Sequence, residues 1–123
     1  MADETMLHGN AWTVTEIAGE PVTVADRPSL QFSSHNRLSG FAGCNRFSGH
    51  YAFADQGEPD GGSLSLSQIA ATRRMCGEAQ MRVERGLFAA LGETSDVRTD
   101  GGQVLLLRGP DQVPLVRLVI AGR

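Results

Sequence analysis

The sequence contains no lysine, and it has little of several other residue types. Two cysteines, one tryptophan and one tyrosine occur among its 123 residues, and aromatic residues make up 6%. All 11 basic residues are arginine, they form no basic run, and the formal net charge is -3. Because affinity for nucleic acid depends mostly on neutralising phosphate charges, this composition argues against a nucleic-acid partner.

Long hydrophobic runs are missing as well. No apolar stretch approaches the ~20 residues needed to span a bilayer, so we expect no transmembrane segment. The first residues, 1–6, are acidic and polar and do not have the basic and apolar regions of a secretion signal. Taken alone, this start fits either a cytoplasmic protein or one whose signal is not part of the chain.

What the chain does contain suits one globular domain. Hydrophobic residues make up 41% and charged residues 20%, which are ordinary values for a folded protein of one core. We expect residues 1–9 to form a flexible N-terminal segment and residues 10–121 to form the domain.

Glycine is abundant, with 15 residues, and it separates short stretches that alternate or are rich in β-branched residues. This punctuation predicts eight or nine short strands joined by turns. The expected strands are 11–17, 21–24, 29–32, 37–42, 46–54, 63–68, 96–99, 103–108 and 114–121.

One stretch, 78–91, has a helical period instead. Val83, Leu87 and Leu91 fall at i, i+4 and i+8, and Phe88 lies beside them. One helix among sequential strands predicts an α+β fold that is mainly β. Its meandering antiparallel sheet must cover an apolar face, either by curling into a barrel or by packing on the helix.

Two motifs stand out, and their order and spacing are distinctive. They consist of Gly40, Gly43, Cys44, Asn45, Phe47, Gly49 and Tyr51 in the first, and of Thr72, Met75 and Cys76 in the second. The second motif lies just before the predicted helix, about thirty residues after the first. Together with Trp12 and the closing apolar strand, they make residues 10–121 resemble the META-domain family, which includes HslJ-like heat-shock proteins.

The resemblance implies an open or cracked antiparallel β-barrel, or curled sheet, with one α-helix. It also implies a bacterial envelope protein linked to heat shock and the stress response, in a family with no established enzymatic activity. We therefore expect a monomeric, non-enzymatic stress-response or structural-interaction protein with no catalytic residue, cofactor or metal. The implied location is the periplasm or the outer membrane, with a signal or lipid anchor outside the chain given and the cytoplasm as the alternative. The implied partner is an envelope protein or an apolar ligand.

The motif residues themselves favour structural roles. Gly40, Gly43 and Gly49 suit a positive φ, a bulge or a close backbone approach. A phosphate-binding loop would need a helix after it, whereas a strand pattern follows. Asn45 tolerates the left-handed region and can hydrogen-bond neighbouring backbone, so we expect it to shape a turn.

Cys44 and Cys76 leave three roles open. A metal site needs about four nitrogen or sulfur ligands, and the histidines show no matching spacing. A nucleophilic cysteine needs a base, and His50 would lie about 20 Å away along an extended strand. A disulfide, or a close thiol pair, would join the glycine-rich segment to the start of the helix, and it suits an oxidising periplasm. We favour this third role.

A second function is that of a carrier for a lipid or another small apolar ligand. A cavity between sheet and helix would then be lined by apolar side chains, namely Trp12, Phe47, Val83, Leu87 and Phe88. The competing interpretation is a filled core, since side chains usually fill small barrels.

Overall fold

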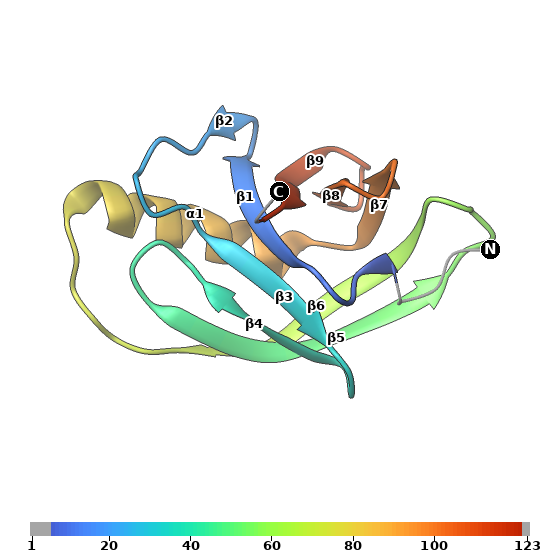
Figure 1. Ribbon diagram of the computed structural model, residues 1–123, viewed down its shortest axis with the longest axis horizontal. Helices are drawn as coiled ribbons and strands as arrows, with labels where there is room; N and C mark the ends of the chain where they lie inside the picture. The colour runs from blue at the N-terminus through green and yellow to red at the C-terminus, as the bar shows by residue number, and fades with distance from the viewer. Residues whose placement is uncertain (1–5, 122–123) are drawn as a thin grey trace.

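Within residues 6–121, nine strands and one helix form close to where the alternating and helical patterns of the sequence place them (Figure 1). The computed structural model describes residues 6–121. Its elements are β1 (Ala11–Ile17), β2 (Glu20–Pro21), β3 (Ser29–Ser33), β4 (Arg37–Phe41), β5 (Arg46–Asp55), β6 (Gly61–Ala71), α1 (Glu78–Glu93), β7 (Asp96–Asp100), β8 (Val104–Arg108) and β9 (Pro114–Ile120).

Antiparallel pairing closes the sheet into a barrel. The strands follow one another in the order β1-β3-β4-β5-β6-β7-β8-β9, β1 also pairs with β9, and β2 extends the far end of β1. The predicted class, an α+β and mainly β fold with an antiparallel barrel and one helix, is confirmed. The barrel is closed, however, and not open or cracked, because Trp12 to Ile17 pair with Val116 to Ile120. This pairing joins the first and last strands in the sequence, so no local sequence pattern predicts it.

Two strands differ from their predicted bounds by more than one residue. β6 runs on to Ala71, because it pairs with β5 through an irregularity where Gln68 has a φ of 55°. The strand expected at 21–24 is replaced by the two-residue β2. Residues 22–24 instead form part of a loop over the start of α1, where they line a groove.

The inward-facing side chains form one core. Among the largest that are fully buried are Trp12, Leu30, Phe32, Leu38, Tyr51, Leu64, Leu105, Leu107 and Leu118 from the strands and Leu87 and Leu91 from α1. The core also includes Leu7, whose carbonyl accepts a 3.2 Å hydrogen bond from Trp12 Nε1. Of the segment 1–9 that was expected to be flexible, residues 1–5 lie outside the described residues and residues 6–9 lead into the barrel with Leu7 buried.

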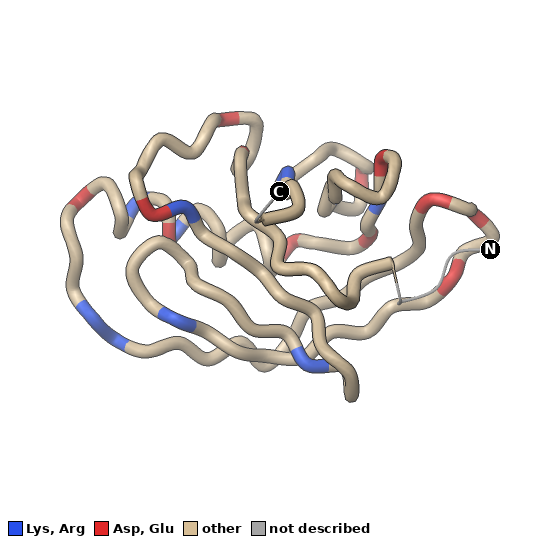
Figure 2. Tube along the Cα trace, in the orientation of Figure 1, with Lys and Arg blue, Asp and Glu red and all other residues tan. Residues whose placement is uncertain are grey.

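Charged residues gather at two ends of the barrel (Figure 2). Arginines lie mainly near the start of α1, whereas acidic residues lie at both ends, with one group at the end that carries the β5–β6 loop. Within residues 6–121, α1 is not long and apolar enough to cross a membrane.

Candidate functional site at the start of the helix

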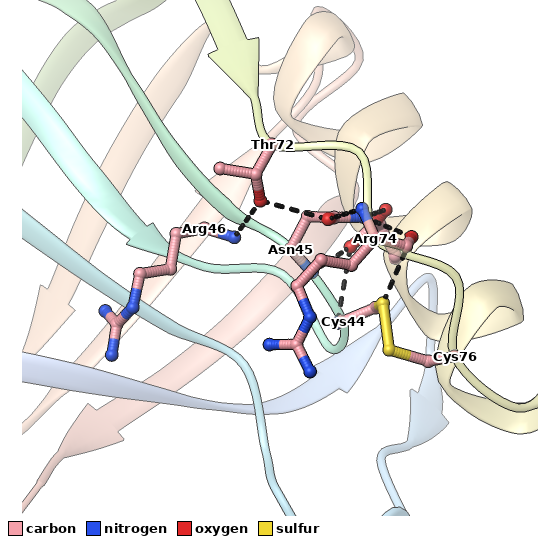
Figure 3. The surroundings of a disulfide bond; sticks show 7 residues. Cys44, Asn45, Arg46, Thr72, Arg74 and Cys76 are labelled. Carbon is pink, nitrogen blue, oxygen red and sulfur yellow. Dashed lines mark hydrogen bonds between the residues drawn. A yellow bond between two sulfur atoms is a disulfide. The ribbon is translucent and has the colours of Figure 1, made fainter.

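Three segments meet where α1 begins (Figure 3). They are the loop between β4 and β5, the segment between β6 and α1, and the first turns of α1 itself. A disulfide joins the first two, with Cys44 Sγ bonded to Cys76 Sγ at 2.09 Å and the two Cα atoms 5.9 Å apart. The disulfide predicted from the sequence is thus present, and it ties two segments that are 32 residues apart in the chain.

Asn45 lies next to the disulfide and is 3% exposed. Its Oδ1 accepts hydrogen bonds from Thr72 Oγ1 (3.0 Å) and from the backbone N–H of Arg74 (2.5 Å). Its Nδ2 donates to the carbonyl of Arg74 (3.2 Å) and to Glu84 Oε2 (2.8 Å). These four bonds use both donors and both acceptor lone pairs of the amide. Asn45 therefore holds the segment before the helix through its side chain.

Glu84 is the residue through which the third segment, α1, joins the site. Its side chain is buried, with the residue 6% exposed. Oε1 accepts the backbone N–H groups of Asn45 (2.7 Å) and Cys44 (3.3 Å), while Oε2 accepts Asn45 Nδ2. A buried carboxylate is tolerated only where hydrogen bonds satisfy its oxygens. Here the donors come from the β4–β5 loop, so the carboxylate fixes that loop to the helix.

Gly43 explains why the loop can approach α1 so closely. Its φ is +117°, a conformation that residues with a side chain rarely adopt. A Cβ atom at this position would also lie 3.1 Å from the carbonyl oxygen of Gln80 and 3.4 Å from Val83 Cγ1. The positive φ therefore falls on Gly43, whereas Asn45 acts through hydrogen bonds.

Together these contacts make a clamp, which we define as Cys44, Asn45, Thr72, Cys76 and Glu84. Thr72 Oγ1 also accepts the backbone N–H of Arg46 at 3.2 Å. Cys44 Sγ lies 3.5 Å from the carbonyl oxygen of Arg74, but a bonded sulfur carries no hydrogen, so this is a packing contact. In this state the sulfurs present no thiolate, and the polar groups bind one another and the backbone.

The other motif residues lie outside the clamp and fit the barrel. A Cβ on Gly40 would lie 2.1 Å from the carbonyl oxygen of Ser29 on β3. Two motif residues belong to the core: Phe47, which is 4% exposed, and Tyr51, which is 2% exposed. Tyr51 also donates a 3.0 Å hydrogen bond to the carbonyl of Ser33. Gly49 lies at the irregularity where β5 meets β6. Met75 does not join the clamp, because its side chain is 86% exposed.

The residues expected to line an apolar cavity differ in burial. Trp12, Phe47 and Leu87 are core residues, while Val83 and Phe88 pack against the core from α1. The rings of Phe47 and Phe88 meet edge to face, with their centroids 5.5 Å apart. The three core residues are therefore packed in the interior, and Phe47 meets the helix through Phe88.

Val83 and Phe88 also reach surface grooves on the two sides of α1. Val83 lines a groove of about 620 Å³ with residues of β1, β2 and the following loop. Phe88 lines another of about 410 Å³ beside β6. Space for a small apolar ligand thus lies along the outside of the helix.

Sequence reasoning missed Glu84, although a signal was present. Glu84 precedes Leu87, Phe88 and Leu91 by three, four and seven positions, which places it on the apolar face of the helix. A carboxylate on a buried face needs donors, and the Gly43–Asn45 turn is where the structure supplies them.

Comparisons with known proteins find the same fold in solved structures. No curated protein matches the chain. Three solved structures share its fold. One structure determined by NMR is 24% identical with a TM-score of 0.73, and the match covers 98% of this chain and 97% of the other. An NMR structure of a protein from Burkholderia xenovorans is 23% identical with a TM-score of 0.69, covering 97% and 86%. A crystal structure of a DUF4847 family protein from Bacteroides vulgatus is 14% identical with a TM-score of 0.64, covering 94% and 95%.

The family assignment comes from the sequence match. The profile of the META domain matches residues 5–121, which include both motifs, every strand and the helix. The clamp joins those two motifs in space, and the barrel around them is the fold shared with the three solved structures. With nearly the whole chain matched, the protein belongs to the META domain family.

Proposed function

We propose that this META domain is a non-enzymatic structural or interaction module of the bacterial envelope that serves in the stress response. The disulfide supports an oxidising compartment, because disulfides persist in the periplasm and are rare in the reducing cytoplasm. The resemblance of the two motifs to HslJ-like proteins supports the stress-response role.

The non-enzymatic part of this proposal rests on one observation. The hydrogen-bonding groups of the clamp already bind one another and the backbone. Asn45 makes four side-chain hydrogen bonds, and Glu84 accepts three. A catalytic group needs a free lone pair, proton or thiolate directed at a substrate. The groups of the clamp that carry chemistry are instead directed at one another, so their role is to hold the loop, the segment before the helix and the helix together.

Two measurements test this proposal. Fractionation of the native bacterium, followed by thiol labelling of the full-length protein, should find an oxidised protein in the periplasm or outer membrane. A reduced cytoplasmic pool would contradict the location. Clamp variants such as Thr72→Ala should lose cellular function only in proportion to their loss of folded protein. A clamp variant that is fully folded but inactive would contradict the structural role.

A carrier of small apolar ligands is the second candidate, favoured by the groove of about 620 Å³ beside α1. Ile17, Val22 and Val24 line this groove from one side, and Ala79 and Val83 line it from the helix. Native mass spectrometry of the protein purified from its host should then show a bound lipid. In that case Val83→Asp should abolish the adduct while the neighbouring exposed substitution Arg85→Gln keeps it. An adduct that survives both changes would place the ligand elsewhere.

A further inference from the structure

One end of the barrel carries most of the arginines. We call it the arginine end and define it by six exposed residues: Arg27, Arg46, Arg73, Arg74, Arg82 and Arg85. These residues come from four separate parts of the chain, so the sequence shows only the pair Arg73-Arg74. The fold assembles the rest (Figure 2).

Hydrogen bonds and shared clefts connect these arginines into one surface. The hydrogen bonds of Asn45 and Thr72 place Arg46 beside Arg74, and both guanidinium groups extend to the same side of the clamp (Figure 3). Arg46 and Arg27 line one cleft of about 860 Å³. Thr23 and Val24 line both this cleft and the groove that contains Arg82, so the basic surface continues to the helix.

Few acidic residues offset this charge. The acidic residues at this end are Asp26 in the cleft, Glu20 in the groove, Glu78 at the start of α1 and the buried Glu84. Glu78 pairs with Arg85 at 3.6 Å. Among residues 6–121, no ion pair engages the other five arginines. The arginine end therefore keeps a positive excess, although the whole chain has a net charge of -3.

The acidic residues of the opposite end are too distant to cancel this excess. β5 runs from Arg46 to Asp55, a span of roughly 30 Å for ten extended residues. The Debye length at physiological ionic strength is only about 8 Å. At the acidic end the arginines are already paired, Arg98 with Glu58 and Arg108 with Asp96, whose hydrogen bond raises the pKa of Arg108.

Met75 adds an apolar group to the arginine end. It follows Arg73 and Arg74 directly and is 86% exposed, and the only other large hydrophobic residue exposed within 6–121 is Val113. Protein interfaces usually centre on a cluster of aromatic and apolar side chains. Apart from Met75, the large apolar side chains at this end lie inside the groove beside α1 and not on the outer surface. A single flexible thioether among arginines suits a fluid lipid interface, where no shape complementarity is needed.

We propose that the arginine end docks on an anionic phospholipid surface, with Met75 inserted among the headgroups. The arginines attract the lipid phosphates, and the acidic end faces away from the bilayer. This inference goes beyond the proposed function, because vesicles test the surface independently of where the protein works in the cell.

The test is co-sedimentation with vesicles of phosphatidylglycerol and phosphatidylcholine in equal parts, against vesicles of phosphatidylcholine alone. The protein should bind only the anionic vesicles and leave them when salt rises from about 0.1 M to about 1 M, where the Debye length falls to about 3 Å. Each basic residue near an anionic surface contributes a factor of about 5 to binding, so R73Q/R74Q should weaken it about 25-fold. The matched control R37Q/R98Q removes two charges away from this end and should change binding less than twofold.

Further outcomes decide the proposal. Met75→Ser should weaken binding about fivefold, and unchanged binding would overturn the insertion of Met75. Absence of binding by the unaltered protein, or equal loss in both double variants, would overturn the membrane surface. Binding to polyglutamate without binding to vesicles would also overturn it and would assign this end to an acidic protein. Matching denaturation midpoints of all variants would exclude unfolding as a cause.

Discussion

Replacing Glu84 with glutamine is the sharpest test of the clamp, because the two side chains have the same shape. The new Oε1 can still accept the backbone N–H groups of Cys44 and Asn45, but the new Nε2 then faces Asn45 Nδ2, donor against donor. Turning the glutamine amide over would point its NH₂ at the two backbone donors. Turning the Asn45 amide over would place its NH₂ against the backbone N–H of Arg74, again donor against donor. No arrangement satisfies every group.

The expected loss follows from these contacts. A hydrogen bond to a charged group contributes about 1.5–3 kcal/mol, and a buried donor without an acceptor costs a further 1–3 kcal/mol, roughly. We expect Glu84→Gln to lower the free energy of unfolding by about 2.5–6 kcal/mol, measured by urea denaturation of the oxidised protein. Glu93→Gln is the matched control, because it makes the same change at an exposed position of the same helix. It should change stability by less than about 0.5 kcal/mol.

A charge swap separates this mechanism from general damage. Asn45→Asp alone brings two carboxylates together at Glu84. In the double variant N45D/E84Q, the glutamine NH₂ can donate to the new carboxylate, so the central hydrogen bond is restored with its direction reversed. The double variant should therefore be more stable than the sum of the single losses predicts, by at least about 1 kcal/mol. Additive losses, or a Glu84→Gln protein as stable as the unaltered one, would refute the reasoning.

Three further changes test other parts of the structure. The double variant C44A/C76A should lose roughly 3–4 kcal/mol of stability, as expected for a loop of this length; the unreduced, unfolded protein should titrate no free thiol, and two thiols per chain would contradict the disulfide. Gly43→Ala should cost more than about 1 kcal/mol, because φ is +117° and the new methyl meets backbone at 3.1 Å; an unchanged urea midpoint would refute this. Gly86→Ala should raise the urea midpoint and add about 0.5–1 kcal/mol of stability, because alanine favours a helix over glycine and the new methyl would lie 3.6 Å from the nearest side chain. Lower stability would mean that the groove beside Gly86 has no room for the methyl.

Local patterns predicted the elements well and their assembly less well. The helix was expected at 78–91 and extends over Glu78–Glu93, because its apolar period marks it clearly. The strand at Ala11–Ile17 was predicted at its observed bounds. Barrel closure was not predictable in the same way, because it depends on a register between the first and last strands. Each strand pattern is compatible with several neighbours, and only the complete sheet selects one.

The site shows the same division. The disulfide could be inferred because two cysteines flank recognisable motifs. The spacing of Glu84 places it on the apolar face of the helix, but its role required knowing which loop lies against it. The arginine end was invisible for a similar reason, since Arg27, Arg46 and Arg82 are distant in sequence and become neighbours only around two shared grooves.

Closure of the barrel has a practical consequence. The backbone N–H of Ala121 donates a 2.8 Å hydrogen bond to the carbonyl of Ala11, so the two ends of the sheet are already neighbours. A glycine linker from Ala121 to the segment before Ala11, which keeps the buried Leu7, would disturb no strand pair, and the chain could be reopened in the exposed loop after Asp55. The domain is thus suited to circular permutation, and it can be grafted into a surface loop of another protein through a single point of attachment.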